Sequence, residues 1–500
     1  MSVPRNNLVR YFVAAIAVNV FAAWIPNVSA RNLVVSDDIA DPMTLDPQKQ
    51  FSEKNHTICR QIFDGLVRFD PDGKIEPALA VSWERINDTR VRFKLRKEVF
   101  FHNGEPFDAE AVRFSMARYT NPETGFPGLY FIDSISHVEV VDNHTVDLIT
   151  KYPDGILLNR LAGLIFMVPS KYLNEKGDKY FASNPVGTGA FVFTTWEKGK
   201  QIALTANKNY WMKGYPKVDG LIFKFIPKER RVKALLSGEV DFVTNPPGTQ
   251  TLAIKSDQRF TVIKKASACT APVSFNLASG PLSVLEVRKA LNYALDKDKL
   301  IRYDLLGNGK IIATFSMDGE AGHNSALKPY KFDIIEAKAL LAKAGFPNGF
   351  TVKAIVKTDT ERTATIIANE LKKVGVKLKI TLVSDADSMG EFSKGGYDMA
   401  IGDIPSPISH SYFAQAIVLY SKSPYCLGGD AKFDSLLEEM VAALNPEKSQ
   451  YLSEKLDKYV YDNAMGLFTY QYIRLYGLSK KLVFTPYVSG IPCFYGAYFQ

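Results

Sequence analysis

The chain has 500 residues, of which 46% are hydrophobic and 23% charged, and its formal net charge is +8. This composition is ordinary for a globular protein and excludes an intrinsically disordered chain. Lysine and arginine are interspersed with aspartate and glutamate, and no basic stripe with interleaved aromatic residues stands out. Nucleic acid is therefore not an expected partner.

The first thirty residues have the three parts of a secretory signal peptide. Arg5 and Arg10 form a positive n-region, residues 11–25 form an apolar run broken by one asparagine, and residues 28–30 supply a small-residue cleavage site. The run is shorter than the roughly 20 apolar residues that cross a bilayer, which argues against a membrane anchor. Residues 1–30 are therefore predicted to direct export, and no cysteine follows them to carry a lipid.

The rest of the chain is too long for one hydrophobic core, because cores stop growing near roughly 250–300 residues, so two lobes are expected. It contains four cysteines, Cys59, Cys269, Cys426 and Cys493, without a Cys-x-x-Cys motif. A thioredoxin-type redox site and a zinc ribbon therefore lack support. An oxidising compartment permits disulfides, and either one or two structural bridges or buried thiols are expected.

Short β-rich segments alternate with amphipathic helical segments in the first half of the chain. Strands are predicted at 32–35, 91–95, 221–226 and 240–243, with two more within 137–148. Helices are predicted at 57–66, 109–119 and 228–236. Asp108 is placed to cap the second of these helices, and Gly238 to end the third.

The second half predicts a β-α-β arrangement. Strands are predicted at 273–277, 350–356, 376–383 and 467–472. Helices are predicted at 286–295, 337–344, 361–374, 433–444 and 454–463. Because parallel strands need a crossover connection, the run from 350 to 383 predicts a parallel sheet covered by helices. The predicted fold class is α/β.

A series of short sequence blocks runs through nearly the whole chain after residue 30. They are Thr44-Leu45-Asp46-Pro47, Ile62–Leu66, Glu76–Ala80, Phe93–Arg96, Phe101–Phe107, Asn184–Phe191, Asn209-Tyr210-Trp211, Gly238–Asp241, Val287–Asp296, Val374-Gly375-Val376 and Gly396–Met399. In this order and spacing they resemble the bacterial extracellular solute-binding proteins of family 5, which include dipeptide, oligopeptide and nickel receptors. Gly187-Thr188-Gly189, within one block, lacks the further residues of a phosphate loop and is interpreted as a tight turn.

The resemblance implies a two-lobed periplasmic binding protein fold of type II, cluster C, with an extra subdomain in lobe I. Lobe I would comprise 31–270 and 478–500 with the subdomain at about 75–204, and lobe II would comprise 271–477. Two crossing strands near 270–277 and 475–482 would form the hinge. Lobe closure about such a hinge is driven by tighter binding of the solute to the closed state.

The implied function is solute capture for an ABC importer. A monomer in the periplasm, with no cofactor and no enzymatic activity, would hold a peptide or peptide-like solute between its lobes. It would deliver the solute to an inner-membrane permease and its ATPase subunits. The alternatives are a receptor for a nickel chelate, haem, an opine or an oligosaccharide, a chaperone-like or adhesive role, and a secreted hydrolase. No Gly-x-Ser-x-Gly or His-Glu-x-x-His motif supports the hydrolase.

Asp403 is the first candidate ligand-binding residue. It matches the acidic position that peptide-binding relatives use to pair with the α-ammonium group, and such charge-assisted hydrogen bonds are strong. The alternative is a loop aspartate that caps a turn beside Pro405. Ala400 stands where these relatives carry a Trp, and Ser406 where they carry a second acid. The cleft is therefore expected either to be wider or to hold something other than a short peptide.

Lys357 and Arg362 are the candidate partners of a ligand carboxylate, because relatives place an Arg in this region. Arg suits bidentate pairing better than Lys, although Arg362 is also typical of a solvated helix start. His410 follows the candidate loop, in a region where nickel-type relatives use a His. A lone His is also typical of a loop or core, and no metal is expected.

Overall fold

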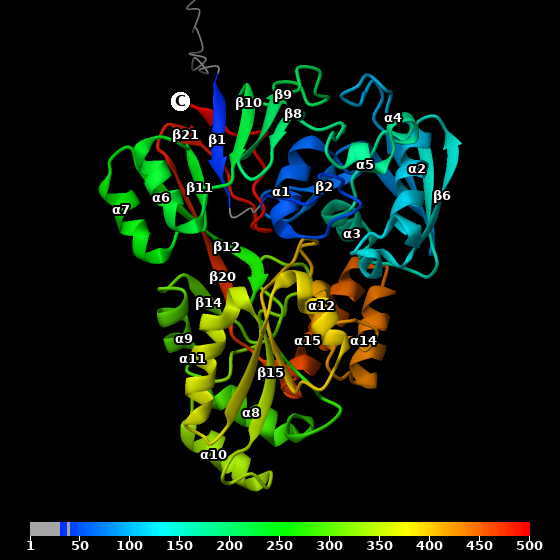
Figure 1. The fold of residues 1–500 in the computed structure, drawn as a ribbon. Helices are drawn as coiled ribbons and strands as arrows, with labels where there is room; N and C mark the ends of the chain where they lie inside the picture. Colours follow the sequence, from blue (N-terminus) through cyan, green and yellow to red (C-terminus); the bar gives the residue numbers. More distant parts are fainter. Residues whose placement is uncertain (1–30, 38–40) are drawn as a thin grey trace, which may run out of the picture.

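The computed structural model describes residues 31–37 and 41–500, so the predicted signal peptide lies outside the described residues. The molecule has two lobes, and the strands β12 (Phe260–Thr270) and β20 (Tyr470–Ser479) run between them (Figure 1). These two strands pair antiparallel along most of their length, with one irregularity between Ala266 and Thr270. The predicted two-lobed α/β class is confirmed. None of the described helices is long and apolar enough to cross a membrane.

A large mixed sheet of nine described strands extends from the upper lobe in Figure 1 along β12 and β20 to β14, which is labelled lower in the view. Besides β12 and β20, they are β1 (Asn32–Ser36), β8 (Phe191–Glu197), β9 (Gln201–Ala206), β10 (Gly220–Lys224), β11 (Phe242–Thr244), β14 (Gly309–Ile311) and β18 (Ile404–Pro405). The first strand lies inside this sheet, parallel to β10 on one side and β11 on the other. Leu33 and Val35 are buried on one face and Val34 is partly buried on the other, as expected of a strand inside a covered parallel arrangement.

A four-stranded antiparallel sheet with the order β4-β5-β7-β6 lies at the edge of the upper lobe. Its strands are β4 (Ala80–Asn87), β5 (Arg90–Leu95), β6 (Ile135–Asp142) and β7 (Thr145–Thr150), and helix α2 (Ala109–Thr120) contacts β6. The alternation predicted for 91–95 is observed, because Val91, Phe93 and Leu95 are buried. Asp108 caps α2 through the N–H of Ala111, at 3.0 Å.

The remaining described elements of the upper lobe are short helices and two-stranded pairs. The helices are α1 (Glu53–Ile62), α3 (Leu157–Leu164), α4 (Ser170–Lys176), α5 (Asp178–Phe181), α6 (Lys228–Ser237) and α7 (Thr251–Ser256). The strand pairs are β2 (Val67–Phe69) with β3 (Ile75–Pro77), and β21 (Leu482–Val483) with β22 (Tyr498–Phe499). The predicted C-cap Gly238 ends α6 in the left-handed conformation.

The lower lobe contains a five-stranded sheet with the order β16-β15-β17-β13-β19. Its strands are β13 (Val273–Phe275), β15 (Thr351–Lys357), β16 (Lys377–Val383), β17 (Met399–Ile401) and β19 (Gly466–Leu467). The predicted parallel arrangement is confirmed, because β15 pairs parallel with both β16 and β17. Helices cover this sheet and flank it: α8 (Leu285–Ala294), α9 (Lys297–Asp304), α10 (Ile334–Lys343), α11 (Glu361–Lys372), α12 (Asp385–Ser393), α13 (Tyr412–Leu419), α14 (Ala431–Val441) and α15 (Pro446–Asp462).

The helix predicted at 57–66 begins and ends four residues earlier. Ser52 caps α1 by accepting a hydrogen bond from the N–H of Asn55, at 3.3 Å. Phe63 is already extended, with φ −121°. The apolar spacing misplaced this boundary because Phe63 and Leu66 are buried in the extended segment after the helix.

Two further expectations are resolved by the described residues. All four cysteines are free thiols, so the expected bridges are wrong and the alternative of unbridged thiols holds. The strand predicted at 467–472 is divided between the short β19 and the beginning of β20.

Several of the sequence blocks converge on the carboxylate of Asp64 in the upper lobe. Asp64 accepts hydrogen bonds from the Thr188 hydroxyl at 3.0 Å, the Tyr210 hydroxyl at 3.1 Å and the Trp211 indole at 2.9 Å. A side chain at Gly187 would place its Cβ 2.1 Å from the Ile62 carbonyl oxygen, so this position needs glycine for close approach rather than for phosphate binding. These blocks therefore stabilise the fold.

Candidate functional site

Two cavities described in the structure lie between the lobes, and Asp403 lines both of them. The first, which we call the apolar chamber, has a volume of about 530 Å³, and the second, the polar chamber, about 660 Å³. The apolar chamber is lined from the upper lobe by Phe51 and Leu164, and from the lower lobe by Lys357 and Phe392. A solute held here would contact both lobes.

The wall of the apolar chamber is built from aromatic rings of distant segments. Phe51 stacks on Phe131 with the ring centroids 5.4 Å apart, and Phe131 packs against Phe413 of α13 at 4.6 Å. On the lower lobe, Phe392 of α12 and Tyr425 meet edge to face at 5.5 Å. All five rings line the chamber, so it offers a large surface for apolar groups.

Asp403 lies in the two-residue connection between β17 and β18. The strand before it belongs to the five-stranded sheet of the lower lobe, where it pairs with β13 and β15. The strand after it pairs with β12, which runs between the lobes, with Thr270 opposite Ile404. The backbone on both sides of Asp403 is therefore fixed, and the carboxylate is held where the two sheets meet.

Lys357 lies beside Asp403 in the apolar chamber. It is the last residue of β15, and its side chain crosses the neighbouring connection, because a Cβ on Gly402 would lie 3.1 Å from the Lys357 Cδ atom. The absence of a side chain at Gly402 gives the lysine room. Two of the predicted site residues, Lys357 and Asp403, therefore line the same chamber.

Ala400 lines the apolar chamber from the middle of β17. It is 6% exposed and packs with Ile355 and Val383, while its neighbours Met399 and Ile401 face the core of the lower lobe. Ser274 of β13 lies opposite Ala400 and lines the same chamber. A small side chain therefore forms the floor at the position where the family resemblance places a Trp in peptide-binding relatives.

Arg362 lines the polar chamber rather than the apolar one. Its guanidinium donates a hydrogen bond to the backbone carbonyl of Tyr303. Asp304, also in this chamber, accepts hydrogen bonds from the Thr363 hydroxyl at 2.5 Å and the Tyr470 hydroxyl at 2.7 Å. The two predicted cations thus lie in different chambers, and Asp403 is the residue that links them.

His410 lines neither chamber. It is buried, and its Nδ1 atom accepts a hydrogen bond from the N–H of Tyr412 at 3.1 Å. Burial, together with the charge of Arg160, lowers the pKa of His410 to about 4, so its imidazole is neutral at physiological pH. Among the described residues, no group of three or more His, Cys, Asp or Glu side chains is placed to hold a metal ion.

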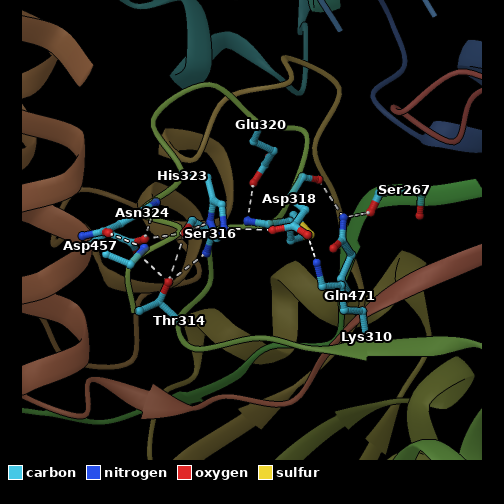
Figure 2. Close-up of polar contacts among 12 residues, drawn as sticks. Ser267, Lys310, Thr314, Ser316, Asp318, Glu320, His323, Asn324, Asp457 and Gln471 are labelled. Atoms are coloured by element: carbon cyan, nitrogen blue, oxygen red, sulfur yellow. Dashed lines mark hydrogen bonds and ion pairs between the residues drawn. The ribbon is translucent and has the colours of Figure 1, made fainter. Parts of the chain in front are cut away.

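A buried polar network near the strands between the lobes was not predicted (Figure 2). Asp457 of α15 accepts hydrogen bonds from Ser316 and Thr314, both at 2.5 Å. Ser316 also hydrogen-bonds His323, whose Nε2 atom lies 3.0 Å from an oxygen of Asp318. Thr314, Ser316, Asp318 and His323 lie on one loop, but Asp457 comes from a distant helix, so no local sequence pattern indicates their contact.

The network is attached to β12 and β20 through Gln471. Its amide donates to the carbonyl of Ser267 at 3.1 Å and to that of Asp318 at 2.8 Å. Glu320, in the same loop, accepts a hydrogen bond from the N–H of Met317 at 3.0 Å. Burial raises the pKa of Glu320 to about 7, against the hydrogen bonds from Ser406 and Met317 that lower it.

His56 is a further residue of the apolar chamber that the sequence did not indicate. Its ring packs on Phe166 with the centroids 5.0 Å apart. Burial and the charge of Arg60 lower the pKa of His56 to about 3. The imidazole is therefore neutral and adds a polar group without charge to the chamber.

Comparison with known families identifies the scaffold. Residues 74–423 match a family model described as bacterial extracellular solute-binding proteins, family 5, middle part. This span includes Lys357, Arg362, Asp403 and His410.

Individual relatives match over most of their length. A glutathione-binding protein, GsiB of Pectobacterium atrosepticum, is 28% identical over 77% of this chain and 76% of its own. Heme-binding protein A of Haemophilus influenzae is 29% identical over 87% of this chain and 86% of its own. The periplasmic binding protein DppA of Helicobacter pylori, solved with the peptide STSA, superposes with a TM-score of 0.83 at 24% identity, covering 94% of this chain and 98% of its own. The last comparison supports the fold.

Proposed function

The chain belongs to family 5 of the bacterial extracellular solute-binding proteins, which serve ABC importers, and on this basis we propose that it is a periplasmic receptor for a peptide or peptide-like solute. The solute would bind between the lobes. The receptor, acting as a monomer, would then deliver it to an inner-membrane permease and its ATPase subunits.

The observation that carries this proposal is the position of Asp403. It lines both chambers and is held between a strand of the lower sheet and a strand paired with β12. An ammonium group of the solute that pairs with this carboxylate would be held at the meeting point of the two lobes. Such a contact stabilises the closed arrangement, because a solute shifts the equilibrium by its differential affinity for the two states.

The other predicted contacts are assigned by their chambers. Lys357, beside Asp403, is proposed to pair with an anionic group of the solute in the apolar chamber. Arg362 is proposed to do so in the polar chamber. We omit His410 from the proposed contacts, because it lines neither chamber.

The relatives support a peptide-like solute to different degrees. GsiB is named for glutathione, which is a tripeptide and carries both an ammonium group and carboxylates. Asp403 and Lys357 offer one partner for each of these charges. Heme-binding protein A is named for a different solute, so haem is included below as a competing ligand.

The test is isothermal titration calorimetry of the purified protein with tripeptides, their N-acetylated forms, glutathione and haem. A free tripeptide is expected to bind, and acetylation is expected to weaken binding about tenfold or more, because it removes the ammonium charge. Asp403→Asn is expected to lose affinity for the free peptide while Asp462→Asn, at an exposed position, retains it. Binding of haem without binding of any peptide would overturn the proposed solute class.

A further inference from the structure

The lining of the apolar chamber is mostly apolar, so charged groups of a peptide backbone would contact only a small part of it. Of the described residues that line it, Lys49, Lys357 and Asp403 carry formal charge. Lys49 forms an ion pair with Asp178 at 2.5 Å. Lys357 and Asp403 line the chamber at or beside the β17–β18 connection, and the rest of the lining is dominated by rings, aliphatic side chains and prolines.

The ring wall is suited to a bulky apolar group. Phe51 and Phe131 lie on the upper lobe, and Phe413 packs against both of them from α13, at 6.2 and 4.6 Å between centroids. Their contact continues the wall from one lobe to the other. An apolar group placed on it would be covered from both sides when the lobes are together.

Ala400 sets the depth of this chamber. Alternation along β17 directs its methyl group away from the core that holds Met399 and Ile401, and toward the chamber. Phe392 packs against the same small cluster and also lines the chamber. A larger side chain at position 400 would occupy space between the floor and the rings.

We propose that the solute is amphipathic, with a bulky apolar group that fills the apolar chamber, and that Ala400 is the specificity-determining residue that admits this group. The charged part of the solute lies at Asp403 and Lys357, and its remaining polar part extends into the polar chamber, which Asp403 also lines. This inference rests on the proposed function for the position of the site, but it names a class of solute that does not have to be a peptide.

The test uses two matched pairs of probes that differ in one apolar group. The peptide pair is Ala-Phe-Ala and Ala-Ala-Ala, and the non-peptide pair is 4-phenylbutylamine and butylamine. The member with the ring is expected to bind about tenfold or more tightly in each pair, because burial of a large apolar side chain contributes that much to binding. Affinities are measured by calorimetry, or by the ligand-dependent rise of the melting temperature for weak probes.

Substitution at position 400 tests the role of the floor. In Ala400→Leu and Ala400→Trp, the ring-bearing probe is expected to bind no more than about threefold more tightly than its partner. The reason is that the added side chain fills the chamber. Ala342→Leu, at an exposed position of α10 that lines neither chamber, is the matched control and is expected to keep the advantage. Circular dichroism melting shows which variants are folded, and the leucine variant provides the result if the tryptophan variant is not.

The outcomes separate this inference from the proposed function. If both peptides bind equally and both amines bind equally, the apolar specificity is overturned, while a peptide receptor remains supported. If 4-phenylbutylamine binds preferentially and neither peptide binds, the amphipathic class is supported and the peptide proposal is overturned. An unchanged preference in Ala400→Leu would refute the role assigned to Ala400.

Discussion

Glu320 is expected to make the protein less stable as the pH rises. Its carboxyl group lies in the buried network beside β20, where burial raises its pKa to about 7 and the charge of Asp457 adds to this effect. The hydrogen bonds from Ser406 and Met317 act in the opposite direction and are outweighed. At a pH between 4.5 and about 7, the folded protein therefore holds a proton on Glu320 that the unfolded chain has released.

The sign and size of the effect follow from this difference in proton binding. Between the ordinary pKa of 4.5 and the raised value of about 7, the folded state binds more protons than the unfolded state, so stability falls as the pH rises through this window. Each pKa unit corresponds to about 1.4 kcal/mol, so the loss between about pH 4.5 and pH 8 is about 3 kcal/mol. The loss of stability is complete at a pH above the raised pKa and absent at a pH well below 4.5.

Glu320→Gln removes the titrating proton but keeps the size of the side chain and a hydrogen-bond donor. The variant is expected to match the native protein near pH 4.5 and to exceed its unfolding free energy by about 3 kcal/mol near pH 8. Urea unfolding followed by circular dichroism measures this difference, and Glu175→Gln, on an exposed helix, controls for a general charge effect. Parallel pH profiles for the native protein and Glu320→Gln would refute the raised pKa.

Three further outcomes are expected. Asp64→Ala should lower the unfolding free energy by at least about 2 kcal/mol in urea titration, because three partly or fully buried donors lose their acceptor. An unchanged midpoint would contradict this. Arg160→Met should lower the unfolding free energy by about 3–5 kcal/mol, because it leaves Asp154, 3.0 Å away, as an unpaired buried charge. The double variant with Asp154→Leu should recover much of this loss. A double variant as unstable as the single one would contradict the pairing. Dithiothreitol should leave the melting temperature unchanged, because the four cysteines are free, and a drop would reveal a disulfide.

Local patterns predicted much of the fold because the forces that create them are local. The caps at Asp108 and Gly238 and the parallel pairing of β15 with β16 depend on residues close in the sequence. The boundary of α1 could not be placed in the same way. Phe63 is buried by tertiary packing, so its apolar character continued the helical spacing beyond the end of the helix.

The candidate site was only partly predictable for a related reason. Family resemblance pointed to Asp403 and Lys357, and both line the apolar chamber. Phe51 and Phe413 meet across a separation of several hundred residues, and no pattern in either segment predicts the contact. The burial of His410 is likewise a tertiary property, so a lone histidine beside the loop was indistinguishable from a ligand.

The connection that carries Asp403 explains how solute binding can be coupled to lobe position. Two residues, Gly402 and Asp403, join a strand of the lower sheet to β18, which pairs with β12. A change in the angle between the lobes that moved the lower sheet relative to β12 would alter the backbone of this connection. A solute that holds the Asp403 carboxylate from both chambers therefore favours one angle over others, as selection of the closed state requires.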